Sequence, residues 1–411
     1  MNQQDIQKLD RDDPLANKRQ AFELPKDSIY LDGNSLGPLP KVVKSRVAEV
    51  VSQQWGQDLI TSWNAHSWID LPITVGEKIA PLIGASKGQV ICCDSISVNL
   101  FKLLSAALKM NSGRTRVLST KDNFPTDLYM VQGLTDLLGK DLCQLNTVEE
   151  SEIEQHLTDS VAVLLLTQVN FRTGKLLDMQ KLTDLAHAKG ILVIWDLAHS
   201  AGAIPVQLDK CQADFAVGCG YKYLNGGPGA PAFLYVAKRH QASIRQPLAG
   251  WMGHAKPFAF SPVYEAAESI NQFQSGTPSV IAMSAMDAAL EVWEGVDIQQ
   301  VRQKSLALAD LFIELVENAP SLQDFVLCSP RDGKERGSQV AFAHQDAYAI
   351  CQALIEQKVI ADFRAPNVLR FGLTPLYTSY QDIESAVAIL VDIVKSAIYT
   401  EARFNKAQKV T

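Results

Sequence analysis

The sequence has no run of about 18 apolar residues, the length needed to cross a bilayer, and the segment from Met1 to Asp13 is polar rather than signal-like. It also lacks a long basic run, and its net charge is −7. A basic surface is the electrostatic signature of nucleic-acid and anionic-membrane binding, so both partners are disfavoured. We therefore expect a cytoplasmic protein that acts on small molecules.

Paired cysteines are also missing. The seven cysteines are an odd number, and none shows the paired spacing of a metal site. Cys92 and Cys93 stand side by side in a strand-like run, so their side chains should point to opposite faces. We expect reduced thiols, no disulfide framework and no bound metal.

What is present is enough apolar sequence for a large core, since 47% of the 411 residues are hydrophobic. Val161 to Leu166 and Ile191 to Trp195 are continuous apolar runs, which are typical of strands buried on both faces. A helical pattern over 178–189 separates them. This strand, helix, strand order predicts an open α/β fold with a mainly parallel sheet between helices. Ligands of such folds bind at the carboxyl ends of the strands.

The pattern changes after Ser279. Helical segments are predicted at 279–294 and 298–318, followed by alternating short strands and helices to about residue 399. We expect a smaller C-terminal α+β domain there, in which the polar stretch 330–338 is an exposed turn. The predicted divisions are an N-terminal arm at 1–41, a large domain at 42–285 and the small domain at 286–411.

Lys222 follows the strand-like run Asp214 to Val217 and stands between glycine-rich turns. Burial disfavours the ammonium form of a lysine, and a neutral amine can form a Schiff base with an aldehyde. Asp196 ends another predicted strand, with His199 three residues later. Pyridoxal phosphate needs such a lysine for its aldehyde and such a carboxylate to keep its ring nitrogen protonated. The pair therefore indicates a pyridoxal-phosphate site.

Four stretches in this order closely resemble the kynureninase family: YLDGNSLGPLP at 30–40, FPTD at 124–127, DLAHSAG at 196–202 and GCGYKYLNGGPG at 218–229. The resemblance extends over nearly the whole chain. It implies the fold type I architecture of the aspartate-aminotransferase superfamily. It also implies hydrolysis of L-kynurenine or 3-hydroxykynurenine to L-alanine and anthranilate or 3-hydroxyanthranilate, in tryptophan catabolism and NAD biosynthesis. The family resemblance further implies a homodimer with active sites at the subunit interface.

The residues that match the family motifs take on the family's roles as expectations. Lys222, Tyr221 and Asp196 are expected to be catalytic. Cofactor contacts are expected from Ile96, Ser97, Phe124, Pro125, Thr126, Asp127, Thr167, Asp196, His199, Tyr221, Lys222, Trp251 and Thr277, with Trp251 and Thr277 coming from the neighbouring subunit. Substrate contacts are expected from Arg370, Trp63, Asn34 and Ser35.

Read without the resemblance, several of these positions leave a plainer alternative open. Ser97 could simply cap a helix, Phe124 could be core, and Asp127 could be a helix cap. Trp63 belongs to a cluster with Trp55 and Trp68 that is typical of core packing. Arg370, inside an apolar strand, either faces solvent or meets a planar anion with its guanidinium fork.

Two other functions fit parts of the pattern. A cysteine desulfurase or class V aminotransferase shares the aspartate, histidine and lysine arrangement. A desulfurase needs a nucleophilic cysteine on a mobile loop, whereas the cysteines at 211, 219, 328 and 351 are predicted to be buried or incidental. A non-catalytic scaffold would have no reason to keep charged side chains at strand ends.

Overall fold

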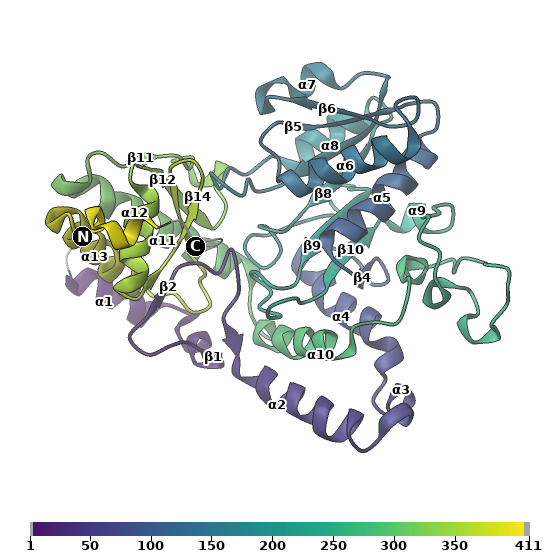
Figure 1. Cartoon of the computed structure of the whole chain (residues 1–411), viewed down its shortest axis with the longest axis horizontal. Helices are drawn as coiled ribbons and strands as arrows, with labels where there is room; N and C mark the ends of the chain where they lie inside the picture. Colours follow the sequence, from purple (N-terminus) through teal and green to yellow (C-terminus); the bar gives the residue numbers. More distant parts are fainter. Residues whose placement is uncertain (1–2, 407–411) are drawn as a thin grey trace.

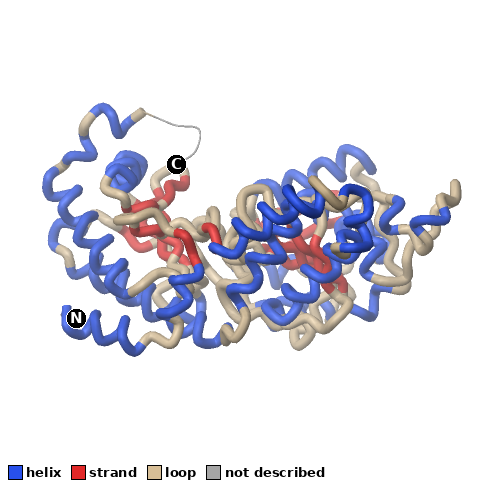
Figure 2. The backbone as a smooth tube through the Cα atoms, turned by 90° about the horizontal axis from the view of Figure 1, so that it is seen from below, coloured by secondary structure: helices blue, strands red, loops and turns tan. Residues whose placement is uncertain are grey.

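The computed structural model describes residues 3–406, and Figure 1 shows two lobes. The larger lobe contains the central sheet, and the smaller lobe holds helix α1 together with the last helices of the chain. In the perpendicular view of Figure 2, the strands form two separate groups, each enclosed by helices. Within residues 3–406, no helix combines the length and apolarity needed to span a membrane.

The sheet of the larger lobe has seven strands in the order β4-β10-β9-β8-β7-β5-β6, and β10 alone runs against the others. The strands are β4 (Val90–Cys92), β5 (Arg116–Thr120), β6 (Gln144–Val148), β7 (Val161–Thr167), β8 (Leu192–Asp196), β9 (Phe215–Cys219) and β10 (Ala232–Val236). Every residue of β7 is buried, which explains its unbroken apolar run. The predicted mainly parallel α/β sheet is confirmed.

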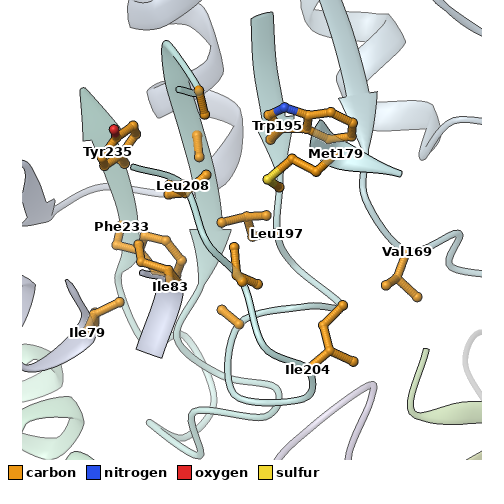
Figure 3. Packing of buried hydrophobic residues seen from close by; sticks show 14 of the residues in the cluster. Ile79, Ile83, Val169, Met179, Trp195, Leu197, Ile204, Leu208, Phe233 and Tyr235 are labelled. Carbon is orange, nitrogen blue, oxygen red and sulfur yellow. The ribbon is translucent and has the colours of Figure 1, made fainter. Parts of the chain in front are cut away.

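Helices cover both faces of this sheet. One face packs against α5 (Ile96–Met110) and α6 (Pro125–Leu138), and the other against α4 (Leu71–Ile79), α8 (Met179–His187) and α10 (Val280–Ala289). Figure 3 shows part of the second face, where Trp195 of β8 lies beside Met179. Cys92 belongs to the core on one face and Cys93 to the core on the other, as their adjacency predicted.

The smaller lobe is built on a four-stranded antiparallel sheet in the order β11-β12-β15-β14. Its strands are β11 (Val326–Leu327), β12 (Gln339–Ala343), β14 (Asp362–Arg364) and β15 (Val368–Gly372), and its main helices are α11 (Ile298–Asn318), α12 (Ala347–Glu356) and α13 (Tyr380–Ser396). These elements share one hydrophobic core. The expected α+β architecture of the C-terminal part is therefore present.

The N-terminal segment is part of the smaller lobe. Ile6 of α1 (Gln3–Asp12) and Leu31 are buried in its core. The carboxylate of Asp10 accepts hydrogen bonds from the first two backbone N–H groups of α13, at 2.7 and 2.9 Å. Strand β2 (Ile29–Tyr30) pairs with β13 (Val359–Ile360). The two ends of the chain thus share one packing unit, and the boundaries at 41 and 285 stay predictions.

One expectation about exposure holds only in part, and another is wrong. Residues 331–335 of the predicted turn are exposed or half-buried, but its last residues are buried. Arg336, within the stretch predicted as an exposed turn, is fully buried because its guanidinium donates to the carbonyls of Pro330 and Arg331 and pairs with Asp310. Trp55, expected in a packed aromatic cluster, is 57% exposed.

Candidate active site

A cavity of about 210 Å³ lies where β7 and β8 end, between the first turns of α5 and α6. Thr167 and Asp196 are paired across the last position of these two strands, so both face the same edge of the sheet. The wall includes the following residues named from the sequence: Ile96, Ser97, Phe124, Thr126, Asp127, Thr167, Asp196, His199, Tyr221 and Lys222. Pro125, the first residue of α6, lies between two of them. The fold thus gathers positions that the chain separates by more than a hundred residues.

Lys222 lies in the turn that follows β9 and is 9% exposed. Its Nζ is 3.0 Å from Nε2 of His199 and 5.9 Å from the ring centroid of Phe124. Burial and then the charge of Lys222 hold the pKa of His199 well below its usual value. The imidazole is therefore neutral and can share a proton with the lysine amine.

Asp196 and Asp127 are two neighbouring buried carboxyl groups, and both lie close to Thr167. Asp196 Oδ1 accepts the backbone N–H of Ala198 at 2.7 Å, and the Thr167 hydroxyl lies 3.4 Å from Asp127 Oδ2. Burial and then Asp196 raise the pKa of Asp127, whereas Lys222 and the Ala198 N–H oppose the effect of burial on the pKa of Asp196. Asp196 is thus the member of the pair whose negative charge is better supported.

Aromatic and hydroxyl groups complete the wall. Phe124 contacts Phe171 edge to face, with ring centroids 5.2 Å apart, and its ring is 39% exposed. The ring therefore lines the cavity and is not core, which was the plainer alternative. Burial and then Cys219 raise the pKa of Tyr221, so its phenol keeps its proton.

The first turn of α5 offers free backbone donors. Ser95 caps this helix, its hydroxyl accepting the N–H of Val98 at 3.4 Å, so Ser97 is not the cap. The N–H groups of Ile96 and Ser97 lie too early in the helix to bond within it, and the helix dipole favours an anion beside them. The Ser97 hydroxyl adds a donor to this phosphate-type site.

Arg370, Ser35 and Asn34 form a neighbouring cluster between the two lobes. Arg370 is 1% exposed, and its guanidinium binds the carboxylate of Asp362. The two residues lie opposite each other on the paired strands β15 and β14. Ser35 Oγ donates to Asp362 Oδ2 at 2.7 Å and accepts from Arg370 Nη2 at 2.8 Å, and Asn34 is buried against Gln339. Of the two alternatives for Arg370, the planar anion is the one observed.

The N-terminal turn is bonded directly to the lysine turn. The Gly37 N–H donates to the carbonyl of Tyr221 at 2.7 Å. A Cβ on Gly37 would lie 2.3 Å from the carbonyl oxygen of Lys222, so only glycine permits this approach.

Three of the named residues belong neither to the cavity wall nor to the cluster around Arg370. Trp63 contacts Trp68 edge to face at 5.9 Å. Trp251 is 39% exposed and packs with Phe258 and Phe260, and Thr277 lies in a loop before α10. Their expected roles stay predictions.

The cavity fits pyridoxal phosphate. It offers an amine for the aldehyde, a buried carboxylate for the ring nitrogen, an aromatic ring for stacking and a helix N-terminus for the phosphate. Asp127 Oδ1 and His199 Nδ1 are buried without a hydrogen-bond partner among residues 3–406. Buried polar atoms are normally paired, so both indicate a ligand with polar atoms of its own.

Asp127→Asn should stabilise the cofactor-free protein. The pKa of Asp127 is higher in the folded protein than in the unfolded chain. Above the unfolded pKa, folding therefore requires Asp127 to take up a proton, and the free energy of unfolding falls as pH rises. We expect the amide to raise the free energy of unfolding by about 1–3 kcal/mol at pH 8, and by less at pH 5. Urea unfolding at both pH values measures this.

The matched control is Asp136→Asn, an exposed position on the same helix α6. Equal gains from both variants, or a larger gain at pH 5, would contradict the assignment.

The sequence interpretation missed the cluster partners Asp362 and Arg364, and also Phe171. Asp362 and Arg364 are two residues apart in β14, so their side chains lie on the same face of the strand, the one that meets Arg370. Two opposite charges two residues apart in a short strand were the available signal.

The comparisons with known proteins agree with this geometry. Residues 301–390 match the model of the kynureninase C-terminal domain. A protein of Deinococcus radiodurans named kynureninase is 52% identical over 385 residues, covering 92% of this chain and 93% of that one. One of Burkholderia pseudomallei with the same name is 46% identical over 408 residues, covering 98% of both.

Solved structures share the fold at low identity. A cysteine desulfurase of Thermococcus onnurineus superposes with a TM-score of 0.76 at 18% identity, over 95% of this chain and 98% of that one. A C-DES mutant with glycine covalently linked to its PLP cofactor gives 0.79 at 15%, over 91% and 99%. These likenesses establish the fold type I architecture alone.

Proposed function

The chain belongs to the kynureninase family, and from this premise we propose that it hydrolyses the Cβ–Cγ bond of L-kynurenine to anthranilate and L-alanine. The observation that carries the proposal is the single cavity in which Lys222, Asp196, His199 and the Ser97 turn converge. In this reaction, water supplies the hydroxyl group that ends on the carboxyl carbon of anthranilate. It also supplies a proton that ends on the released alanine.

Pyridoxal phosphate, when bound, supplies a protonated ring that withdraws electrons from the bonds at the substrate's Cα. Asp196 holds the positive charge of that ring, because its buried carboxylate has the Ala198 N–H to stabilise it. Lys222 takes the proton from Cα, and the neutral His199 beside it can accept hydrogen bonding from the amine.

Tyr221 is the proposed proton donor in the later steps, since its phenol stays protonated and its ring centroid lies 5.7 Å from Lys222 Nζ. Phe124 would offer its ring for stacking with the cofactor, and Arg370 would attract the substrate carboxylate. Trp63, Asn34 and Ser35 are proposed to bound the space for the rest of the substrate.

Cysteine desulfurase chemistry has less support. Cys219 lines the cavity, but its thiol is buried and points to the carbonyl of Ala198 at 3.8 Å. Burial raises its pKa, which disfavours the thiolate that a desulfurase needs.

The experiment that tests the function is anthranilate fluorescence after L-kynurenine is added to the protein reconstituted with pyridoxal phosphate. Parallel samples receive 3-hydroxykynurenine and L-cysteine. We expect anthranilate from L-kynurenine and no sulfide from L-cysteine. Cofactor binding without product from either kynurenine would contradict the proposal.

We also propose a cytoplasmic homodimer. An apolar surface groove of about 690 Å³ beside the lysine turn supports a second copy, with walls from Val43 of α2 (Lys41–Glu49), Trp55, Pro228 and Ile281. Such a groove is typical of a protein interface. Trp251 and Thr277 would then reach the partner's cofactor phosphate. The seven free cysteines support the reducing compartment.

Complementation checks the shared site. Lys222→Ala and Trp251→Ala variants should each be poorly active. An equimolar mixture of the two should regain up to about a quarter of wild-type turnover, since about half of its dimers are mixed and one of the two sites in each mixed dimer combines intact residues from both chains. Light scattering gives the mass. If confirmed mixed dimers do not recover turnover, the proposal that Trp251 serves the partner's site is contradicted.

A further inference from the structure

The cluster around Asp362 contains a second guanidinium, that of Arg364. Its Nη2 lies 2.7 Å from Asp362 Oδ2 and donates to Ser35 Oγ at 3.2 Å. Arg364 is 33% exposed, whereas Arg370 and Asp362 are each 1% exposed. One buried carboxylate therefore lies between two arginines, and only one of these is accessible.

The hydrogen bonds of Arg370 leave it little to offer a ligand. An arginine has five N–H groups. In Arg370, Nε donates to Asp362 Oδ1 at 2.9 Å, Nη2 donates to Asp362 and Ser35, and Nη1 donates to the carbonyl of Phe171. Within residues 3–406, a single Nη1 hydrogen lacks a partner, so Arg370 alone cannot bind a carboxylate through two parallel bonds.

Arg364 keeps more donors free. Its Nη1 donates one hydrogen to the carbonyl of Phe363 at 3.3 Å, and its Nη2 donates to Ser35 and forms the ion pair with Asp362. Nε and the second Nη1 hydrogen have no partner in the described part of the chain. These two donors and the free one of Arg370 can serve the same anion.

The net charge of the cluster favours binding of that anion. Burial acts to raise the pKa of Asp362, but Arg370 and Arg364 outweigh it and keep this carboxylate ionised. Burial and then Asp362 raise the pKa of Asp32 to about 7, and among residues 3–406 its buried Oδ1 has no hydrogen-bond partner. With Asp32 protonated, two guanidinium charges face one carboxylate charge.

Arg364 also acts on the cavity electrostatically. Burial is the main cause of the lowered pKa of His199 and of the raised pKa of Tyr221, and the charge of Arg364 acts to lower both. Arg364 donates to Ser35 Oγ, and two residues after Ser35 the Gly37 N–H donates to the carbonyl of Tyr221, so the guanidinium lies beside the segment that contacts the lysine turn.

We propose that Arg364 is a substrate-binding residue that holds the α-carboxylate together with Arg370, while Asp362 is the positioning residue that fixes both guanidinium groups. The inference rests on the proposed function for the identity of the substrate. It assigns direct carboxylate contact to a side chain outside the motifs that carried the family resemblance.

The test compares L-alanine with L-alaninamide, which lacks the carboxylate charge, as probes of the holoenzyme followed by the absorbance of the bound cofactor. The wild-type protein should bind L-alanine more tightly than L-alaninamide. Arg364→Gln should weaken L-alanine binding by about 10- to 100-fold and change L-alaninamide binding less than about twofold. It should also raise KM for L-kynurenine with little change in kcat.

Two further variants keep the test decisive. Arg364→Lys retains the charge without the planar fork and should give an intermediate loss. Arg403→Gln, an exposed arginine paired with Glu356 and Glu401, should leave both probes unchanged. Thermal unfolding shows whether each variant is folded. If Arg364→Gln is not, Arg364→Lys is compared with wild type in its place.

Equal weakening of both probes, unchanged L-alanine binding, or a wild type that does not distinguish the probes would each overturn the assignment. Failure of wild type to release anthranilate would instead overturn the proposed function. The two failures are separable because probe binding needs no turnover.

Discussion

Replacing Lys222 with alanine should lower the release of anthranilate from L-kynurenine by at least about 10³-fold, because the variant loses the amine that takes the Cα proton. In the described part of the chain, Lys222 is the one lysine that lines the cavity. The absorbance of the covalently held cofactor should disappear as well. Stopped-flow fluorescence and absorbance spectra measure the two effects.

Lys238→Ala is the matched control, since this lysine is exposed beyond the end of β10. Added methylamine should restore part of the turnover of the Lys222 variant if the missing group acts as a base. Full turnover without the lysine would show that another group removes the proton.

Asp196→Asn should reduce turnover by about 10²-fold or more, in line with the loss of one preorganised electrostatic partner. Asparagine has nearly the same shape and can still accept the Ala198 N–H, so the change removes charge and leaves packing intact. Cofactor should still be bound through Lys222. Its absorbance maximum should shift, because the ring nitrogen is no longer held in its protonated form.

The control for this change is Asp178→Asn, at the N-cap of α8, where either side chain can accept the Lys181 N–H. An Asp196→Asn protein with wild-type turnover would contradict the electrostatic role. One that neither folds nor takes up cofactor would indicate that Asp196 is structural.

Much of the fold could be predicted because the local pattern and the final environment agree. The bounds of α11 are those predicted from periodicity, and β7 was recognised by its unbroken apolar run. The convergence of Asp196, Thr167 and the Ser97 turn followed from the rule that the ends of parallel strands share one edge.

What escaped prediction depends on contacts between distant segments. The sequence could not choose between solvent and a planar anion for Arg370, because the choice depends on the register that sets Asp362 opposite it. Arg336 looked like part of an exposed polar turn, yet its buried guanidinium donates to carbonyl groups of the turn and pairs with Asp310. The roles predicted for Trp251 and Thr277 require a second chain, and no contact within a single chain can test them.

Because both ends of the chain share one core, the two lobes cannot complete their folding at the same stage of synthesis. Ile6 and Leu31 leave the ribosome first, but α13, whose first turn is capped by Asp10, is made last. The larger lobe can fold while translation continues, whereas the N-terminal segment must wait, with its apolar side chains exposed, for nearly the whole chain. A truncated transcript would therefore yield a nascent chain whose unfinished lobe is a target for chaperones and proteases.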